Sequence, residues 1–174
     1  MRSKIQEALK YSKADYTEIR IEEKEATTVV FRGKDLETAN ATLDKGGIVR
    51  CLVKNHGWGV ASFNNIDDLK ARVDQAYACA LVAHSELPIE LAQVAPAEEL
   101  ISVPMGRDFR DVSMAEKKAL AQHYNDLLRG HSERIIDTNA SYFDNFTTLI
   151  FANSEGTYLQ EERPQVGLVA AAVA

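Results

Sequence analysis

The sequence predicts an α+β fold, a mainly antiparallel sheet of long hairpins with two or three packed helices. Three observations lead to this class. Long stretches alternate apolar and polar side chains with the period of a β-strand. Short turns that contain glycine separate these stretches, which is typical of antiparallel hairpins. A few other stretches carry apolar side chains at helical spacing behind a capping residue.

The first part of the chain is expected to begin with a short helix over residues 3–11. Residues 14–32 then alternate as one strand. Because a strand of this length is unusual, we expect a bulge near residues 24–26. Gly33 is expected to supply the turn after it, and the chain returns as a strand over residues 36–43.

The segment "DKGGIVRCLVKNHGWGVASFNN", residues 44–65, is rich in glycine and contains the only tryptophan. We expect its glycines to form two tight hairpins, the second around Trp58. A nucleotide-binding loop is excluded because such a loop opens a helix at once, whereas residues 60–63 continue as a strand. The turn and hairpin residues predicted for the whole chain are Gly33, Gly46, Gly47, Gly57, Trp58, Gly59, Asn153 and Gly156.

The second part of the chain starts with a helix that Asn64 or Asn65 caps and that runs to about residue 83. Prolines mark the next stretch as an extended connection. Ser113 and Glu116 have the spacing of a capping box, which predicts another helix, and Gly130 is expected to end it. The strands expected after it cover residues 134–141, 147–153, 157–163 and 165–174.

These elements divide the chain into three parts. Residues 1–85 form a helix, an antiparallel meander and a second helix, residues 86–112 form the extended connection, and residues 113–174 add a helix and strands. The sequence stops inside the apolar run 166–174, so we expect the last part to continue into a missing downstream domain. We also expect this apolar last strand to pair with another copy through an open edge.

Residues able to support catalysis do not gather in the sequence. The histidines are scattered, so no metal site is expected in this chain. Cys51 shares a strand face with Val49 and Val53, and Cys79 lies between two alanines of a helix, which favours core positions over nucleophiles. The run Glu22-Glu23-Lys24-Glu25 favours a solvated strand face or a bulge over a metal or peptide site. No catalytic or metal-binding residue is therefore predicted, and the substrate-binding residues stay unknown; the histidines are His56, His84, His123 and His131.

Composition and charge exclude several classes of protein. The chain has 20 Lys and Arg against 26 Asp and Glu, a formal net charge of −6, and no basic cluster, so a nucleic-acid partner is not expected. No apolar run reaches the length of a membrane span. Two cysteines are too few for a disulfide framework, and the N-terminus has no apolar signal core. We therefore expect a cytoplasmic protein without a membrane partner.

The order of features over residues 14–80 is more specific than any single motif. An acidic strand that opens with Ala-Asp-Tyr is followed by a glycine hairpin, by "GGIVRCLV" and by "GWGVAS" with a helix behind it. This order resembles the N-terminal region of the TldD/PmbA family, zinc metallopeptidases once called modulators of DNA gyrase. The stretch "FANSEGTYLQEERPQVGLVAAAVA", residues 151–174, resembles a later strand pair of that family.

The resemblance implies a noncatalytic N-terminal module of a TldD-like peptidase. In that branch a downstream HExxxH motif holds zinc, so zinc is implied for the longer parent and no cofactor for this chain. The module would shield the site, guide a peptide substrate and form the subunit interface of a homo-oligomer or of a hetero-oligomer with a family paralogue. The alternative is a PmbA/TldE-like partner or binding module without peptidase activity. Arg163-Pro164 favours the TldD branch.

Overall fold

The computed structural model describes residues 1–174 and contains one six-stranded sheet with three α-helices. The helices are α1 (Arg2–Tyr11), α2 (Leu69–Val82) and α3 (Met114–His131). The strands are β1 (Tyr16–Arg32), β2 (Asp35–Val53), β3 (Gly57–Phe63), β4 (Glu98–Ile101), β5 (Asp137–Asn153) and β6 (Tyr158–Val173). Their order in the sheet is β3-β2-β1-β5-β6-β4. The sheet is mostly antiparallel, with β4 parallel to β6, so the predicted α+β class is confirmed.

The strands are longer than the sequence predicted. The turn predicted at residues 44–47 is wrong, because β2 runs without a break through Gly46 and Gly47. Gly47 is needed there for space: a Cβ atom would lie 2.6 Å from the carbonyl oxygen of Arg20 and would overlap the ring of Phe63. The glycine therefore allows a close approach inside the sheet and does not turn the chain.

Two other predicted interruptions are also absent. β5 continues through residues 142–146, where Tyr142, Asp144 and Phe146 alternate on one buried face. β6 continues through Pro164, although proline cannot donate a backbone hydrogen bond. Pro164 lies beyond the four residues of β6 that pair with β4, a position where sheets tolerate proline.

The chain forms two compact units, which are described separately. Unit 1 comprises Met1–Glu23, Lys45–Ser102 and Thr148–Glu161, and unit 2 comprises Lys24–Asp44, Val103–Thr147 and Glu162–Ala174. Each of the four long strands β1, β2, β5 and β6 contributes residues to both units. The order of elements along the chain cannot reveal such a division, because neighbouring residues of one strand belong to different units.

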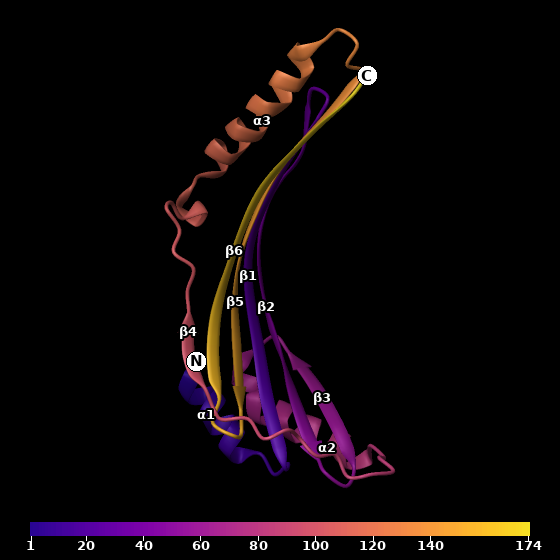
Figure 1. Ribbon diagram of the computed structural model, residues 1–174, viewed down its shortest axis with the longest axis vertical. Coiled ribbons are helices and arrows are strands. Elements are labelled where there is room, and N and C mark those ends of the chain that lie inside the picture. The colour runs from indigo at the N-terminus through magenta and orange to yellow at the C-terminus, as the bar shows by residue number, and fades with distance from the viewer. The chain divides into compact units, whose positions relative to one another are not determined.

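In unit 1, α1 and α2 pack together and α2 lies against β3 (Figure 1). The predicted helices are confirmed, and Asn65 is the cap: its Oδ1 accepts a hydrogen bond from the backbone N–H of Asp67 at 3.0 Å. A single turn of 3-10 helix, η1 (Ile66–Asp68), then leads into α2. The core includes Ile5 and Ala8 of α1, Leu69, Val73, Ala76 and Ala80 of α2, and Ile19, Ile21, Val49 and Cys51 of the sheet.

The two cysteines have different environments. Cys51 is fully buried, as expected, and its Sγ lies 3.5 Å from Thr17 Oγ1. Burial raises the pKa of its thiol, which makes a reactive thiolate unfavourable. The expectation that Cys79 is also buried is wrong, because α2 turns its opposite side to the sheet and leaves Cys79 exposed.

In unit 2, α3 packs on the sheet through Ala121, which joins Val29, Phe31 and Tyr142 in a second core. The predicted capping box is confirmed: Ser113 Oγ accepts a hydrogen bond from the N–H of Glu116 at 3.2 Å, and Glu116 Oε2 accepts one from the N–H of Ser113 at 3.1 Å. Because both bonds are local, the sequence fixes where α3 begins.

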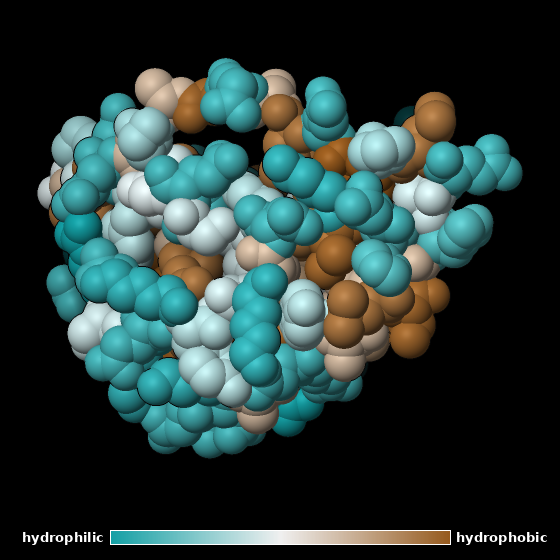
Figure 2. Space-filling view, turned by 90° about the horizontal axis from the view of Figure 1, so that it is seen from below, coloured by the Kyte–Doolittle hydropathy of each residue, from teal (hydrophilic) through white to brown (hydrophobic).

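The stretch between α2 and α3 is largely irregular, as expected, with β4 and a short 3-10 helix, η2 (Phe109–Asp111), as its regular elements. No helix of the chain combines the length and apolar character that crossing a membrane requires. Figure 2 shows a surface on which most side chains are hydrophilic and hydrophobic ones gather in places. The exposed apolar side chains of unit 1 include Val82, Leu87, Val94 and Leu100.

Candidate functional site

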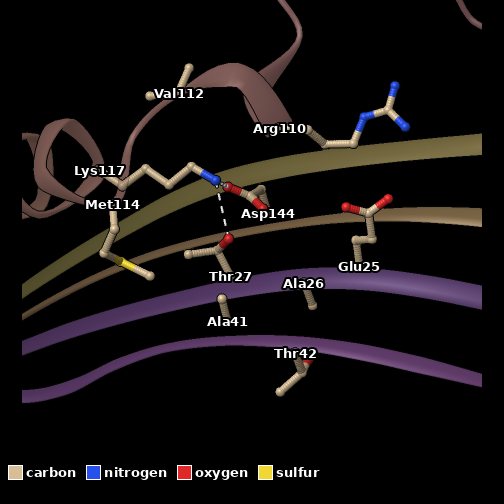
Figure 3. A pocket seen from close by; sticks show the side chains of 10 residues that line it. All are labelled: Glu25, Ala26, Thr27, Ala41, Thr42, Arg110, Val112, Met114, Lys117 and Asp144. Atoms are coloured by element: carbon tan, nitrogen blue, oxygen red, sulfur yellow. Dashed lines mark hydrogen bonds and ion pairs between the residues drawn. The ribbon is translucent and has the colours of Figure 1, made fainter.

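A cavity of about 240 Å³ in unit 2 brings together charged residues from distant parts of the sequence (Figure 3). Its lining consists of Glu25, Ala26 and Thr27 of β1, Ala41 and Thr42 of β2, Arg110, Val112, Met114 and Lys117 of η2 and α3 with the residues between them, and Asp144 of β5. Charged groups that converge on a concave surface are the usual starting point for a binding-site hypothesis. We therefore call this cavity the candidate site.

A buried ion pair forms one wall of the candidate site. Lys117 Nζ lies 2.7 Å from Asp144 Oδ2 and donates a hydrogen bond to Thr27 Oγ1 at 3.1 Å. The hydroxyl of Tyr142 donates to the same Asp144 oxygen at 2.6 Å. Burial, together with this bond to Asp144, raises the pKa of Tyr142. Charges removed from water need such partners, because an unpaired buried charge is strongly unfavourable.

Helix and strand periodicity place the two charges. Lys117, Ala121 and Asn125 are the buried residues of α3, and their spacing of four puts them on the face that meets the sheet. The capping box fixes the start of the helix, so Lys117 falls in its first turn. Asp144 shares its buried face of β5 with Tyr142 because residues two apart in a strand point the same way.

Arg110 closes one end of the candidate site. Its guanidinium donates to both carboxylate oxygens of Asp108 over distances of 2.6 to 3.1 Å, and it lies 3.6 Å from the ring centroid of Phe146. The hydrogen bonds from Arg110 lower the pKa of Asp108. Forked contacts of this kind hold an arginine in one orientation.

Glu25 lies opposite Arg110 and points toward it (Figure 3). No hydrogen bond or salt bridge holds its carboxylate, and its charge reaches Arg110 only through space. Glu162 acts on Arg110 in the same way. Asp108 pairs with the Arg110 guanidinium, and Glu25 and Glu162 add further negative charge that acts on it through space, so this end of the site is negative.

The residues that the sequence singled out lie elsewhere. Gly33 (φ 54°) turns the chain between β1 and β2, and Gly156 (φ 101°) lies in the turn after β5. Asn153 accepts hydrogen bonds from the N–H groups of Glu155 and Thr157 at 3.1 and 2.9 Å in that same turn. Gly57 (φ 153°) opens β3. The others lie inside strands, Gly46 and Gly47 in β2 and Trp58 and Gly59 in β3.

Trp58 and Gly59 contribute to packing in unit 1. The indole is half-buried, with the guanidinium of Arg50 4.4 Å from its ring centroid and the ring of Tyr16 edge-on at 5.9 Å. A Cβ atom on Gly59 would overlap backbone atoms of Ala76 and Ala80 in α2. Gly59 is therefore the residue that lets α2 approach β3.

A second cavity, of about 360 Å³, lies in unit 1 between Tyr16 and Leu52 on the sheet and Glu90 and Leu91 of the irregular stretch. It is larger than the candidate site, but no buried ion pair lines it. Burial raises the pKa of Tyr16 to about 12, and a hydrogen bond to Glu18 adds to this. The tyrosine therefore stays neutral and serves as packing rather than as a base.

No sequence pattern predicts the candidate site. Lys117 stands between Glu116 and Lys118, a run that is typical of a solvated helix surface. One signal was present, since Lys117 precedes Ala121 by four residues on the packed face of the helix. Its partners Thr27 and Asp144 are 90 and 27 residues away in the sequence, and no local pattern connects them.

A metal does not fit the residues present. The four histidines do not converge, and no group of three or more His, Cys, Asp or Glu side chains is arranged to hold an ion. The candidate site itself offers two carboxylates beside an ammonium and a guanidinium, whereas protein zinc sites use imidazole, thiolate and carboxylate ligands. No chemical step can be assigned to a metal bound by these residues.

Comparison with known proteins identifies relatives for both parts of the chain. Residues 17–80 match the family described as PmbA/TldA metallopeptidase domain 1, and residues 107–174 match the PmbA/TldA metallopeptidase central domain. A protein of Synechocystis sp. named as a metalloprotease is 40% identical over 151 residues, which cover 86% of this chain and 32% of that protein. The chain spans about a third of the length of the curated relatives that it matches.

Solved structures share the fold. A structure from Thermotoga maritima described as a putative modulator of a DNA gyrase superposes with a TM-score of 0.82 at 16% identity, covering 99% of this chain and 40% of that one. The structure of TldE from Thermococcus kodakarensis gives 0.72 at 15% identity, covering 99% and 38%. Both family matches follow the order that the sequence resemblance indicated, and we conclude that this chain belongs to the TldD/PmbA family, of which it comprises domain 1 and the central domain.

Proposed function

We propose that this chain is the noncatalytic N-terminal module of a TldD-like zinc-dependent peptidase. The observation that carries the proposal is the 40% identity to a protein named as a metalloprotease, combined with a chain that offers no group of zinc ligands. Chemistry that these residues do not support would then belong to a downstream part of a longer protein. The module would shield that site, guide peptide substrates and contribute to the subunit interface.

The fold suits a guiding role. β3 pairs with β2 only over Gly47–Val53, and β4 pairs with β6 only over Tyr158–Glu161. In unit 2, β2 and β6 therefore each have one strand neighbour. Unpaired strand edges present N–H and C=O groups to an extended chain. An extended peptide would pair with such an edge, and a strand of another subunit would pair with it in the same way.

The alternative is a PmbA/TldE-like partner without peptidase activity. The fold likeness to TldE and to the other solved structures does not separate the two readings, because likeness at this identity concerns the fold alone. The sequence identity to a metalloprotease favours the TldD branch. The two readings differ in one feature, the HExxxH motif downstream, which the reading frame of the gene beyond residue 174 would show.

The experiment compares the gene's full-length product with the chain of residues 1–174. Metal analysis after dialysis is expected to find about one zinc per full-length molecule and none on the shorter chain. Cleavage of an unfolded protein is expected from the full-length product alone, to stop with a chelator and to return with zinc. Zinc bound stoichiometrically by the shorter chain, or cleavage by it, would refute the noncatalytic role. A zinc-free, inactive full-length product would favour the alternative.

A further inference from the structure

The candidate site opens on an unpaired part of the sheet. Because β3 pairs with β2 only from Gly47 onward, residues 35–46 of β2 have β1 as their only strand neighbour. Ala41 and Thr42, which line the cavity, belong to this open edge. An extended peptide binds such an edge by main-chain hydrogen bonds and places alternate side chains in adjoining pockets. The cavity is therefore positioned as a side-chain pocket for a peptide on β2.

The charges inside the cavity decide which side chain fits. The Lys117 and Asp144 charges cancel in their buried pair. At the other end, the charge of Arg110 is paired with that of Asp108, and Glu25 points toward Arg110 from the opposite side of the cavity (Figure 3). The carboxylate without a hydrogen bond or salt bridge that lines the cavity is that of Glu25. An acidic ligand would meet a net negative charge there, whereas a cation would be attracted.

The rest of the lining fits the stem of a long basic side chain. Val112, Met114 and Ala41 supply apolar surface, against which the methylene groups of lysine or arginine pack while the charged end reaches a carboxylate. Lys117 has three N–H donors, of which Asp144 and Thr27 receive two. The third is left for an acceptor such as a peptide carbonyl.

We propose that unit 2 binds extended basic peptides, with the main chain on the open edge of β2 and a Lys or Arg side chain in the cavity, paired with Glu25. This inference rests on the peptide-guiding role in the proposed function and names the substrate class of that role. Nucleic acid is disfavoured by the same negative charge that attracts a basic side chain.

The test uses the unaltered chain of residues 1–174 and fluorescence anisotropy of short labelled peptides rich in Thr and Val. The peptides differ only in a central lysine, norleucine or glutamate. We expect the lysine peptide to bind most tightly and the glutamate peptide least. N-methylation of the backbone amides of the lysine peptide is expected to weaken binding, because it removes donors that an edge strand needs. These comparisons use the unaltered chain, so they do not depend on whether a variant folds.

Glu25→Gln then tests the assigned partner. It is expected to weaken binding of the lysine peptide about fivefold, the factor that an ordinary exposed ion pair contributes. Binding of the norleucine peptide should stay unchanged. Glu133→Gln is the matched control, because it removes the same charge from an exposed turn of the same unit. We expect it to leave both affinities unchanged.

Several outcomes would overturn the inference. Equal affinity for the lysine and glutamate peptides, or no measurable binding, would remove the basic-peptide assignment. Equal effects of Glu25→Gln and Glu133→Gln would show that the affinity depends on the net charge of the chain and not on the cavity. Full binding of the N-methylated peptide would remove the edge of β2 from the interaction. None of these results bears on zinc content or cleavage by the full-length product, so the proposed function fails or stands separately.

Discussion

Lys117 Nζ and Asp144 Oδ2 lie 2.7 Å apart in side chains that are 6% and 4% exposed, and they connect α3 to β5 within unit 2. The attraction between two buried charges is largely offset by the loss of their hydration, so such a pair adds little net stability over apolar residues. Removal of one partner has a different consequence, because the remaining charge stays buried without compensation.

We predict that Lys117→Met lowers the free energy of unfolding by about 3–5 kcal/mol. Lys118→Met, on the next residue of α3 and half-buried, is the control and should change it by less than about 0.5 kcal/mol. Urea unfolding followed by circular dichroism measures both. Similar values for the two variants would show that the pair is not buried as described.

Replacing the whole cluster should be less harmful than breaking it. We predict that the combination of Lys117→Met, Asp144→Leu and Tyr142→Phe is more stable than Lys117→Met alone. Tyr142→Phe is included because the tyrosine hydroxyl donates to Asp144 and would otherwise lose its buried acceptor. The same urea titration decides this, and a triple variant less stable than the single one contradicts it.

Two glycines should respond to alanine in opposite directions. Gly59→Ala places a methyl group onto backbone atoms of α2, and we expect a loss of about 3 kcal/mol or more because neither backbone can yield easily. Gly130→Ala meets nothing within 4 Å near the end of α3, so the better helix propensity should add up to about 1 kcal/mol. Thermal unfolding gives both signs, and an equal response would contradict the close contact of β3 and α2.

Alkaline pH should destabilise the fold through two buried tyrosines. Burial raises the pKa of Tyr16 to about 12 and raises that of Tyr142 as well. The folded chain therefore keeps protons that the unfolded chain releases above its ordinary tyrosine pKa of about 10. Stability from this source is complete below pH 10 and is lost as the pH rises toward 12.

Thermal unfolding between pH 8 and pH 12 would show this loss. The variant Tyr16→Phe should have a smaller decrease over the interval above pH 10, and absorbance at 295 nm should lose a late step in its tyrosine titration. Tyr124→Phe is the control, because Tyr124 lies at an exposed position. A pH response of Tyr16→Phe identical to that of the unaltered chain would show that Tyr16 ionises normally.

The open edge of β6 should support association between copies. Beyond Glu161, β6 has β5 as its only strand neighbour, and Val166, Val169 and Val173 are exposed. We predict concentration-dependent association in sedimentation velocity, and its loss in Val169→Lys because a charged side chain blocks edge pairing. Val82→Lys changes an exposed valine of α2 and should have no effect. A monomer at all concentrations would contradict this role of β6.

Local sequence patterns predict the features that depend on contacts between near neighbours. Ser113 and Glu116 fix the start of α3 because both bonds of the capping box join residues three apart. Alternation and helical spacing gave the α+β class, and the order of strands and glycines between residues 14 and 80 indicated the family. These signals are local, so they can be recognised in the sequence without knowing which residues are partners across the sheet.

Other features depend on contacts between residues that are far apart in the sequence. Gly47 looks like a turn residue in the sequence, yet Phe63 and Arg20 pack so closely on it that it holds two strands together. Cys79 looks like a core residue, but the rotation of α2 on β3 leaves it exposed. Lys117, Thr27 and Asp144 lie together because β1 and β5 are aligned in the sheet and α3 packs on the same face of it. Because a buried charge without a partner is strongly unfavourable, the two charges must pair. Neighbouring residues in the sequence do not show that these side chains are buried.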